Sequence, residues 1–481
     1  MHSSSPQRSA PLAAPAACRS PNRPPRKLTR ISWWAGSPIF KKITARRPIA
    51  ITKRCNARPA DPELLEGAVA SALAVGDVER ARAVAQMAAS HRVSAPHADL
   101  VRAVDALAAG RYRQARDHLA RVRGGAADAL VERILLNWTR TAEGRVDDVV
   151  SDVSAADAAR PYAGLFAFQR AMAFDFAGRT DEARLAYDVA EEGGLWIPPA
   201  IDRHADFLAR NGQRDEALEL IRRRDGRQGN AALLAAITRI EAGQAIGEPL
   251  TPARGAAIGL YGLGTIFIQE SASADGLTAL TLATMLDPRL DAARLAFAEA
   301  QVNLGHTGAA RAALADIPAQ SVYSASAKAM ESWVLLQEDR GDDAVASARA
   351  SVEEGGGVRA ERALADIYRN LERYGEAEPI YSRLIETQPA EWRLYFSRGV
   401  ARERLQRWSE AEADFRRALE LSPDQPDVLN YLGYTLVDRG ERLDEALALI
   451  QRAVDIRPMS GAIIDSLGWA YYRRGEFERG G

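Results

Sequence analysis

Cysteine and histidine are scarce in this chain, which leaves few side chains for metal binding or covalent catalysis. Among 481 residues there are two cysteines, Cys18 and Cys55, and six histidines. No two histidines stand four residues apart and none lies near a cysteine, so no metal-ligand spacing is present. Both cysteines fall within the first 60 residues, so the remainder of the chain needs no disulfide. We therefore expect no bound metal.

Long apolar runs and the common catalytic motifs are also missing. No stretch of 18 apolar residues occurs, so no transmembrane helix is expected. There is neither a Walker loop nor a Gly-x-Ser-x-Gly elbow. The run Gly259-x-x-Gly262-x-Gly264 looks like a phosphate loop, but no strand precedes it and an apolar helix follows, so close helix packing is its expected role. These absences predict a chain with no catalytic residues and no cofactor.

Acidic residues are absent from residues 1–60, and this hides the charge of the rest. The whole chain has a net charge of −1, but the first 60 residues hold 13 Lys or Arg and no Asp or Glu. The remainder therefore carries 50 basic and 64 acidic residues, a net charge of −14. Because binding to nucleic acid needs a basic face that neutralises phosphates, we expect no nucleic-acid partner.

Residues 1–60 also lack helical and strand periodicity, and they hold nine of the 23 prolines. Three interpretations are open. The segment resembles a targeting peptide, since it is rich in Arg and Ser and has no acids. It could be a lipoprotein signal ending at Cys18, although prolines break the preceding apolar run. It could also be non-native sequence from a misplaced start or a frameshift. On each interpretation we expect disorder.

What the chain does have is a period of 34 residues. Five glycines stand 34 apart, at Gly76, Gly110, Gly144, Gly178 and Gly212. Five residues after each comes a small or branched residue, Ala81, Ala115, Val149, Ala183 and Ala217. The glycine suits the left-handed end of one helix, and the small residue lets the next helix cross closely. This period indicates helix–turn–helix units, so we predict an all-α fold, a right-handed α-solenoid.

The clearest units are C-terminal. Residues Gly399, Trp408, Ala411, Phe415, Ala418 and Pro423 occupy positions 8, 17, 20, 24, 27 and 32 of one unit. This pattern resembles the tetratricopeptide repeat (TPR). The strings at 428–434 (VLNYLGY) and 465–470 (DSLGWA) also resemble a bacterial family of long, usually exported multi-TPR proteins. That resemblance implies a non-enzymatic scaffold in the periplasm or cell envelope. The cytoplasm is the alternative if residues 1–60 are not a working signal.

The repeat pattern divides the chain into five parts. We predict a basic segment at 1–60, an N-terminal array at 61–225, an irregular connection at 226–255, degenerate repeats at 256–357, and a C-terminal array at 358–481 whose last repeat is truncated. A single continuous superhelix is the alternative to two arrays. Each unit is expected to contact only its immediate neighbours.

The concave face of the C-terminal array is the predicted partner site. In TPR stacks, positions 2, 5, 9, 12 and 13 of the first helix of each unit line this groove. The predicted groove residues are Arg362, Asp366, Arg369, Phe396, Asn430, Tyr434, Asp465, Trp469 and Tyr472. Aromatic side chains with Arg and Asn suit an extended peptide or a partner helix. The alternative is that several of them pack between units, Trp469 above all.

We therefore predict a protein-interaction scaffold that holds a peptide or partner helix. The alternative is the regulatory TPR part of an enzyme, a glycosyltransferase or peptidase, whose catalytic domain is missing or separate. The last repeat stops where its second helix should begin, which would leave Leu467 and Tyr471 uncovered. Self-association through this uncapped repeat is therefore also expected.

Overall fold

The structure is a computed structural model that describes residues 60–149, 162–194, 197–225, 230–244, 247 and 249–476. The regular elements in these residues are all helices, as predicted for an all-α chain. None of the helices in the described ranges is long and apolar enough to cross a membrane. The basic segment up to residue 59 and the start of the truncated second helix at 477–481 lie outside the described residues.

The N-terminal helices follow the 34-residue period. All five glycines of the period have positive φ, between 71° and 80°, and each ends the first helix of a unit. The left-handed conformation is accessible to glycine because it has no Cβ. The described helices of this part are α2 (Pro62–Ala74), α3 (Val78–Ser90), α4 (Pro96–Ala108), α5 (Tyr112–Leu119), α6 (Ala126–Ala142), α8 (Tyr162–Phe176), α9 (Thr180–Glu192), α10 (Pro198–Arg210), α11 (Arg214–Asp225) and α12 (Ala231–Glu241).

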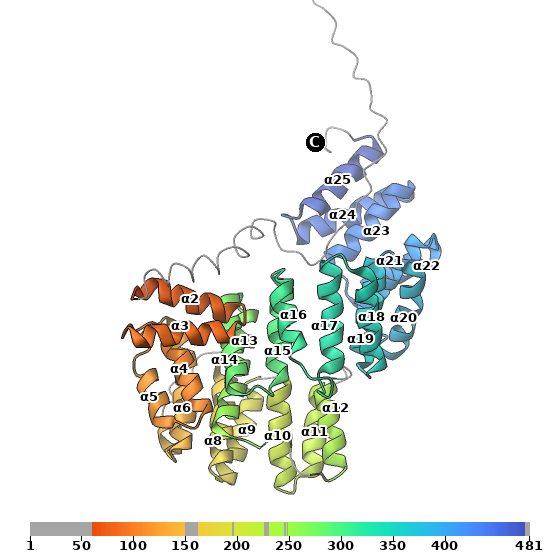
Figure 1. The fold of residues 1–481 in the computed structure, drawn as a ribbon. Helices are drawn as coiled ribbons and strands as arrows, with labels where there is room; N and C mark the ends of the chain where they lie inside the picture. The colour runs from red at the N-terminus through yellow and green to blue at the C-terminus, as the bar shows by residue number, and fades with distance from the viewer. Residues whose placement is uncertain are drawn as a thin grey trace, which may run out of the picture. The chain divides into compact units, whose positions relative to one another are not determined.

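The later helices continue in pairs, each helix packing on the next (Figure 1). They are α13 (Pro252–Gln269), α14 (Ser273–Leu286), α15 (Asp291–Asn303), α16 (Thr307–Ala315), α17 (Ser324–Gln337), α18 (Gly341–Glu353), α19 (Gly357–Asn370), α20 (Tyr374–Thr387), α21 (Trp392–Arg404), α22 (Trp408–Leu421), α23 (Pro426–Arg439), α24 (Leu443–Ile456) and α25 (Gly461–Arg474).

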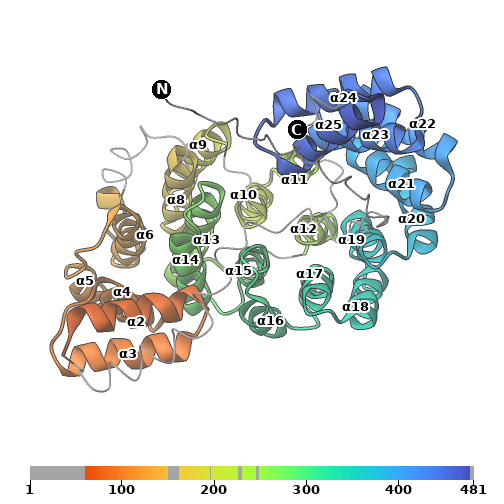
Figure 2. The same cartoon turned by 90° about the horizontal axis from the view of Figure 1, so that it is seen from above.

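Helices α13 and α14 break the rule that a unit contacts only its neighbours. Helix α13 packs against α4, α6 and α8, and α14 packs against α2 and α4, as Figure 2 shows from above. Thr281 on α14 donates a hydrogen bond to the Leu73 carbonyl of α2 at 2.8 Å, although the two residues are 208 positions apart. Gln301 on α15 donates to the next carbonyl, that of Ala74, at 2.6 Å. The neighbour-only expectation was wrong for this pair.

Composition explains why this pair leaves the simple stack. Both helices are apolar around most of their circumference, so each must be covered on several sides. The predicted packing role of the glycine run is confirmed. A Cβ on Gly259 would lie 2.6 Å from the Gln169 amide, and one on Gly262 would lie 2.7 Å from Leu165. Glycine therefore lets α13 approach α8 more closely than any other residue would.

One hydrophobic core runs from Leu65 to Ala300 and includes α13 and α14. Smaller clusters follow along the C-terminal helices, in keeping with a stack in which each pair covers the next. The predicted domain limits stay predictions. For function, this means that helices α13 and α14 of the same chain cover α2, α4, α6 and α8, which are first helices of the N-terminal units.

Candidate interaction face

All nine predicted groove residues lie on the first helices of the last four units. We call the side chains that α19, α21, α23 and α25 contribute at these positions the A-helix face. Side-chain hydrogen bonds link neighbouring helices here. Tyr381 on α20 donates to Asp366 on α19, Tyr431 on α23 donates to Glu403 on α21, and Arg473 on α25 donates to the Asp438 carbonyl of α23. Whether a partner binds here stays a prediction, and the following contacts describe how the face is built.

On α19 a single carboxylate serves two guanidinium groups. The Tyr381 hydroxyl donates to Asp366 Oδ1 at 2.7 Å. Arg369 Nη2 lies 3.5 Å from the same oxygen, and Arg362 Nε lies 3.9 Å from Oδ2. Burial and the charge of Asp366 raise the pKa of Tyr381 well above its usual value, so this hydroxyl stays a donor. The Nε atom of Arg369 is buried and has no hydrogen-bond partner.

On α21 the predicted residue Phe396 has a packing role. Its ring lies 6.0 Å from that of Phe415 on α22 and 5.8 Å from that of Tyr431 on α23. The Phe415 and Tyr431 rings are 5.3 Å apart, which closes the cluster. Such tilted and edge-on pairs stabilise the contact between helices beyond their buried area. A contact between Phe396 and a partner stays a prediction.

Arg404, at the end of α21, was missed by the sequence reasoning. Its side chain is 52% exposed, and its Nε lies 3.3 Å from Glu403 Oε2, which also accepts the Tyr431 hydroxyl at 3.2 Å. Its charge opposes the rise in pKa that burial and Asp438 cause at Tyr434 on α23. The spacing rule that selected Arg369 reaches Arg404 at position 13 of the next unit, so the signal was present.

Helices α23 and α25 supply amide and aromatic groups. Asn430 is half-buried, and its Oδ1 is buried without a hydrogen-bond partner. On α25, Trp469 stacks on Tyr472 with ring centroids 5.4 Å apart and planes 14° apart. The Arg473 guanidinium lies 5.5 Å from the Trp469 ring centre and donates to the Asp438 carbonyl at 3.2 Å. Trp469 is therefore held between neighbours, although its Nε1 is buried and unpaired.

The two other predicted residues on α25 are accessible. Asp465 is exposed, and Tyr472 is 56% exposed. Leu467 and Tyr471, which were expected to lack a cover, are half-buried. Self-association through this repeat stays a prediction.

The unpaired polar atoms of this array coincide with the predicted face. Among the described residues from 358 to 476, three side chains hold a buried nitrogen or oxygen without a hydrogen-bond partner: Arg369 Nε, Asn430 Oδ1 and Trp469 Nε1. All three residues belong to the nine predicted positions. A buried polar atom without a partner costs about 1–3 kcal/mol. Two donors and one acceptor of these residues are therefore buried without a hydrogen-bond partner among the described residues.

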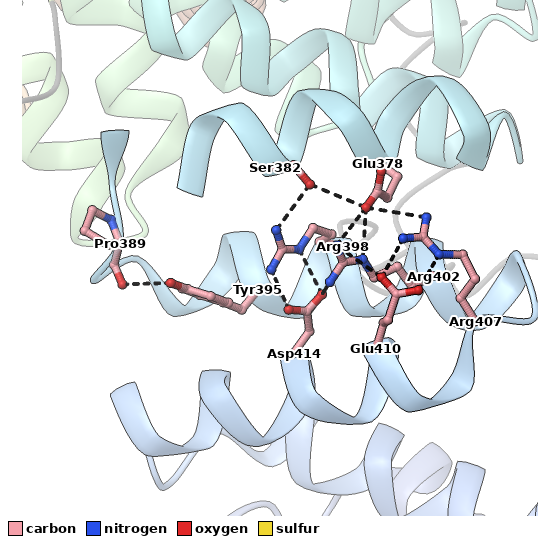
Figure 3. Close-up of polar contacts among 9 residues, drawn as sticks. All are labelled: Glu378, Ser382, Pro389, Tyr395, Arg398, Arg402, Arg407, Glu410 and Asp414. Carbon is pink, nitrogen blue, oxygen red and sulfur yellow. Dashed lines mark hydrogen bonds and ion pairs between the residues drawn. The ribbon is translucent and has the colours of Figure 1, made fainter. Parts of the chain in front are cut away.

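A network of arginines and carboxylates links α20, α21 and α22 (Figure 3). Arg398 on α21 forms a bidentate pair with Asp414 on α22, at 2.9 and 2.7 Å, and donates to Ser382 on α20 at 3.2 Å. Arg402 donates to Asp414 at 2.9 Å and to Glu378 on α20 at 2.9 Å. Because Asp414 is buried and shared by two arginines, the network holds the three helices in one register.

Within the ranges that the structure describes, no group of three or more His, Cys, Asp or Glu side chains is arranged to hold a metal ion. The A-helix face thus offers hydrogen bonds, guanidinium groups and aromatic rings. Arginine and aromatic side chains are enriched at protein–protein interfaces.

Comparison with known proteins agrees with the helical repeats. Residues 362–426 and 401–460 match the family model described as tetratricopeptide repeat. None of the curated proteins matches the chain.

Several solved structures are similar in part. A tetratricopeptide repeat protein from Parabacteroides merdae is 18% identical, with a TM-score of 0.38 over 57% of this chain and 98% of that one. The APC/C hetero-tetramer Cut9–Hcn1 is 13% identical, with a TM-score of 0.42 over 88% of this chain and 92% of that one. YrrB, described as a TPR protein with an unusual peptide-binding site, is 19% identical, with a TM-score of 0.31 over 39% and 96%. At these scores the likenesses carry no argument about function.

Proposed function

Because the chain is an all-α tetratricopeptide repeat protein, an architecture that serves as a protein-interaction scaffold, we propose that its A-helix face holds an extended segment of a partner protein. The single observation that carries this proposal is the position of the three unpaired polar atoms, on Arg369, Asn430 and Trp469. A polypeptide backbone offers N–H donors and carbonyl acceptors in alternation, which are the hydrogen-bond partners that these three atoms lack.

The packing of the N-terminal half also supports this choice of face. Helices α13 and α14 cover α2, α4, α6 and α8, so a partner would meet the chain's own helices there. The corresponding first helices of the C-terminal array keep half-buried and exposed aromatic side chains, Tyr434, Trp469 and Tyr472. Aromatic and arginine side chains are the ones that contribute most to binding energy at interfaces. We propose a binding role without catalysis.

A peptide selection tests the proposal on the full chain. The probe is a phage-displayed library of random twelve-residue peptides, selected on the immobilised protein. Trp469→Phe removes the Nε1 donor and keeps an aromatic ring, and Asn430→Ala removes the unused acceptor. If each atom forms one hydrogen bond to the bound backbone, each variant should weaken binding by about tenfold, or roughly 1.4 kcal/mol.

The matched control is Arg417→Ala on α22, whose side chain is exposed and pairs with Glu420 on its own helix at 2.8 Å. This variant should bind the selected peptides as the wild type does. Selected peptides that bind both face variants with unchanged affinity would show that the A-helix face is not the site.

A further inference from the structure

The two ends of the A-helix face differ in chemistry. On α19 and α21 the guanidinium groups are more exposed than the carboxylates beside them. Arg362 and Arg404 are 37% and 52% exposed, whereas Asp366 and Glu403 are 18% and 23% exposed. Each carboxylate also accepts a hydrogen bond from a tyrosine beneath it. This end of the face therefore exposes more positive than negative charge to the solvent.

Several arginines of the second helices form local pairs. On α20 and α22, or at the residue just before them, Arg373, Arg407 and Arg417 each pair with the glutamate three residues later. On α19, by contrast, Arg362 and Arg369 share Asp366, and the Nε of Arg369 has no partner. At this end of the A-helix face three guanidinium groups, those of Arg362, Arg369 and Arg404, thus lie beside two carboxylates, those of Asp366 and Glu403.

The α23 and α25 end has the opposite character. Its side chains are Tyr434, Trp469 and Tyr472, with the exposed carboxylate of Asp465 nearby on α25. The guanidinium of Arg473 on α25 already lies against the Trp469 ring and donates to a backbone carbonyl. This end offers aromatic surface without a free cation, so it favours apolar or aromatic side chains of a partner.

We infer that the partner segment is bipolar, with acidic side chains over α19 and α21 and an apolar or aromatic stretch over α23 and α25. This inference rests on the proposed function, because it specifies the segment that the same face holds. Charge complementarity identifies the occupant. Carboxylates of the segment would pair with Arg362, Arg369 and Arg404, where planar guanidinium groups are suited to carboxylate binding. An apolar stretch would cover the Trp469–Tyr472 stack.

The test uses the full chain and three fluorescein-labelled twelve-residue peptides, with binding followed by fluorescence anisotropy. The first peptide joins a Glu-rich half to a Leu/Phe-rich half. The second has Lys in place of every Glu, and the third has Gln there. We expect the Glu peptide to bind at least about tenfold more tightly than the Lys peptide at low salt. Added NaCl should weaken the Glu peptide most, since the pairs are solvent-exposed.

Charge reversal locates the acidic half. The double change Arg362→Glu and Arg404→Glu should weaken the Glu peptide roughly tenfold and improve binding of the Lys peptide. The matched control Arg417→Glu reverses an exposed arginine on α22 and should leave both affinities unchanged. Trp469→Phe should weaken the Glu and Gln peptides alike, because it acts on the apolar half.

The outcomes separate the two proposals. If the Lys peptide binds as tightly as the Glu peptide and Trp469→Phe weakens both, the face binds peptides but the inferred polarity is wrong. If charge reversal leaves the Glu peptide unaffected, the acidic half does not lie over α19 and α21. If no peptide binds in a manner sensitive to Trp469→Phe and Asn430→Ala, the proposed function fails together with the inference.

Discussion

The close approach of α13 to the N-terminal helices makes Gly255→Ala a sensitive test of the fold. A Cβ at Gly255 would lie 2.1–2.4 Å from three atoms of the Trp138 ring on α6. Trp138 is 1% exposed, and its Nε1 donates to Gln169 on α8 at 2.6 Å. Packing and this hydrogen bond therefore fix the ring in place. Overpacking of a buried site costs about 1–3 kcal/mol, and an overlap of this size favours the upper end.

The helix propensity of alanine opposes this cost. Replacing glycine by alanine within a helix stabilises it by about 1 kcal/mol. The expected net effect of Gly255→Ala is therefore a loss of roughly 2 kcal/mol in the free energy of unfolding. The matched control is Gly67→Ala in α2, where nothing lies within 4 Å of the added Cβ and the residue is exposed. This control should gain about 1 kcal/mol.

The assay is guanidinium denaturation followed by circular dichroism at 222 nm, with amide exchange measured on α6 and α13. The two variants should differ by about 3 kcal/mol, and α13 should exchange faster only in Gly255→Ala. Equal denaturation midpoints for Gly255→Ala and Gly67→Ala would refute the packing of α13 on α6, because the same substitution would then meet the same open surroundings.

Four further predictions concern polar groups. Thr281→Val keeps the side-chain shape but leaves the α2 carbonyl unpaired, so it should cost about 1 kcal/mol and speed amide exchange at the end of α2. Burial opposes protonation of His97, but a hydrogen bond and nearby carboxylates raise its pKa overall. Its contribution to stability should therefore be complete below the pKa of the unfolded state and lost as the pH rises through the pKa of the folded state. Unfolding of His97→Gln at several pH values and NMR titration of His97 would check this. Burial lowers the pKa of His204 to about 4, so stability should instead fall as pH drops from about 6.5 towards 4, and a pH-independent unfolding energy in this window would contradict it. Asp414→Asn leaves two half-buried arginines short of a buried carboxylate and should cost about 3–5 kcal/mol, measured against Arg417→Ala by denaturation.

The candidate site was partly accessible to sequence reasoning. Position within the unit located Asp366, Asn430 and Trp469 on the first helices, because helical periodicity determines which residues share a face. The same rule could not tell that Phe396 packs between helices, since its neighbours Phe415 and Tyr431 come from other helices. Whether a residue is buried depends on which other helices pack over it, and the periodicity of its own helix carries no information about those helices.

The sequence by itself determined the helical unit and its register. Each of the glycines at Gly76, Gly110, Gly144, Gly178 and Gly212 ends a helix in the left-handed conformation, a local requirement that any copy of the unit would impose. Only the tertiary structure decided which units keep an uncovered face. Contacts such as Thr281 with Leu73 join residues 208 positions apart. They depend on the fit between two distant surfaces, and no local pattern encodes that fit.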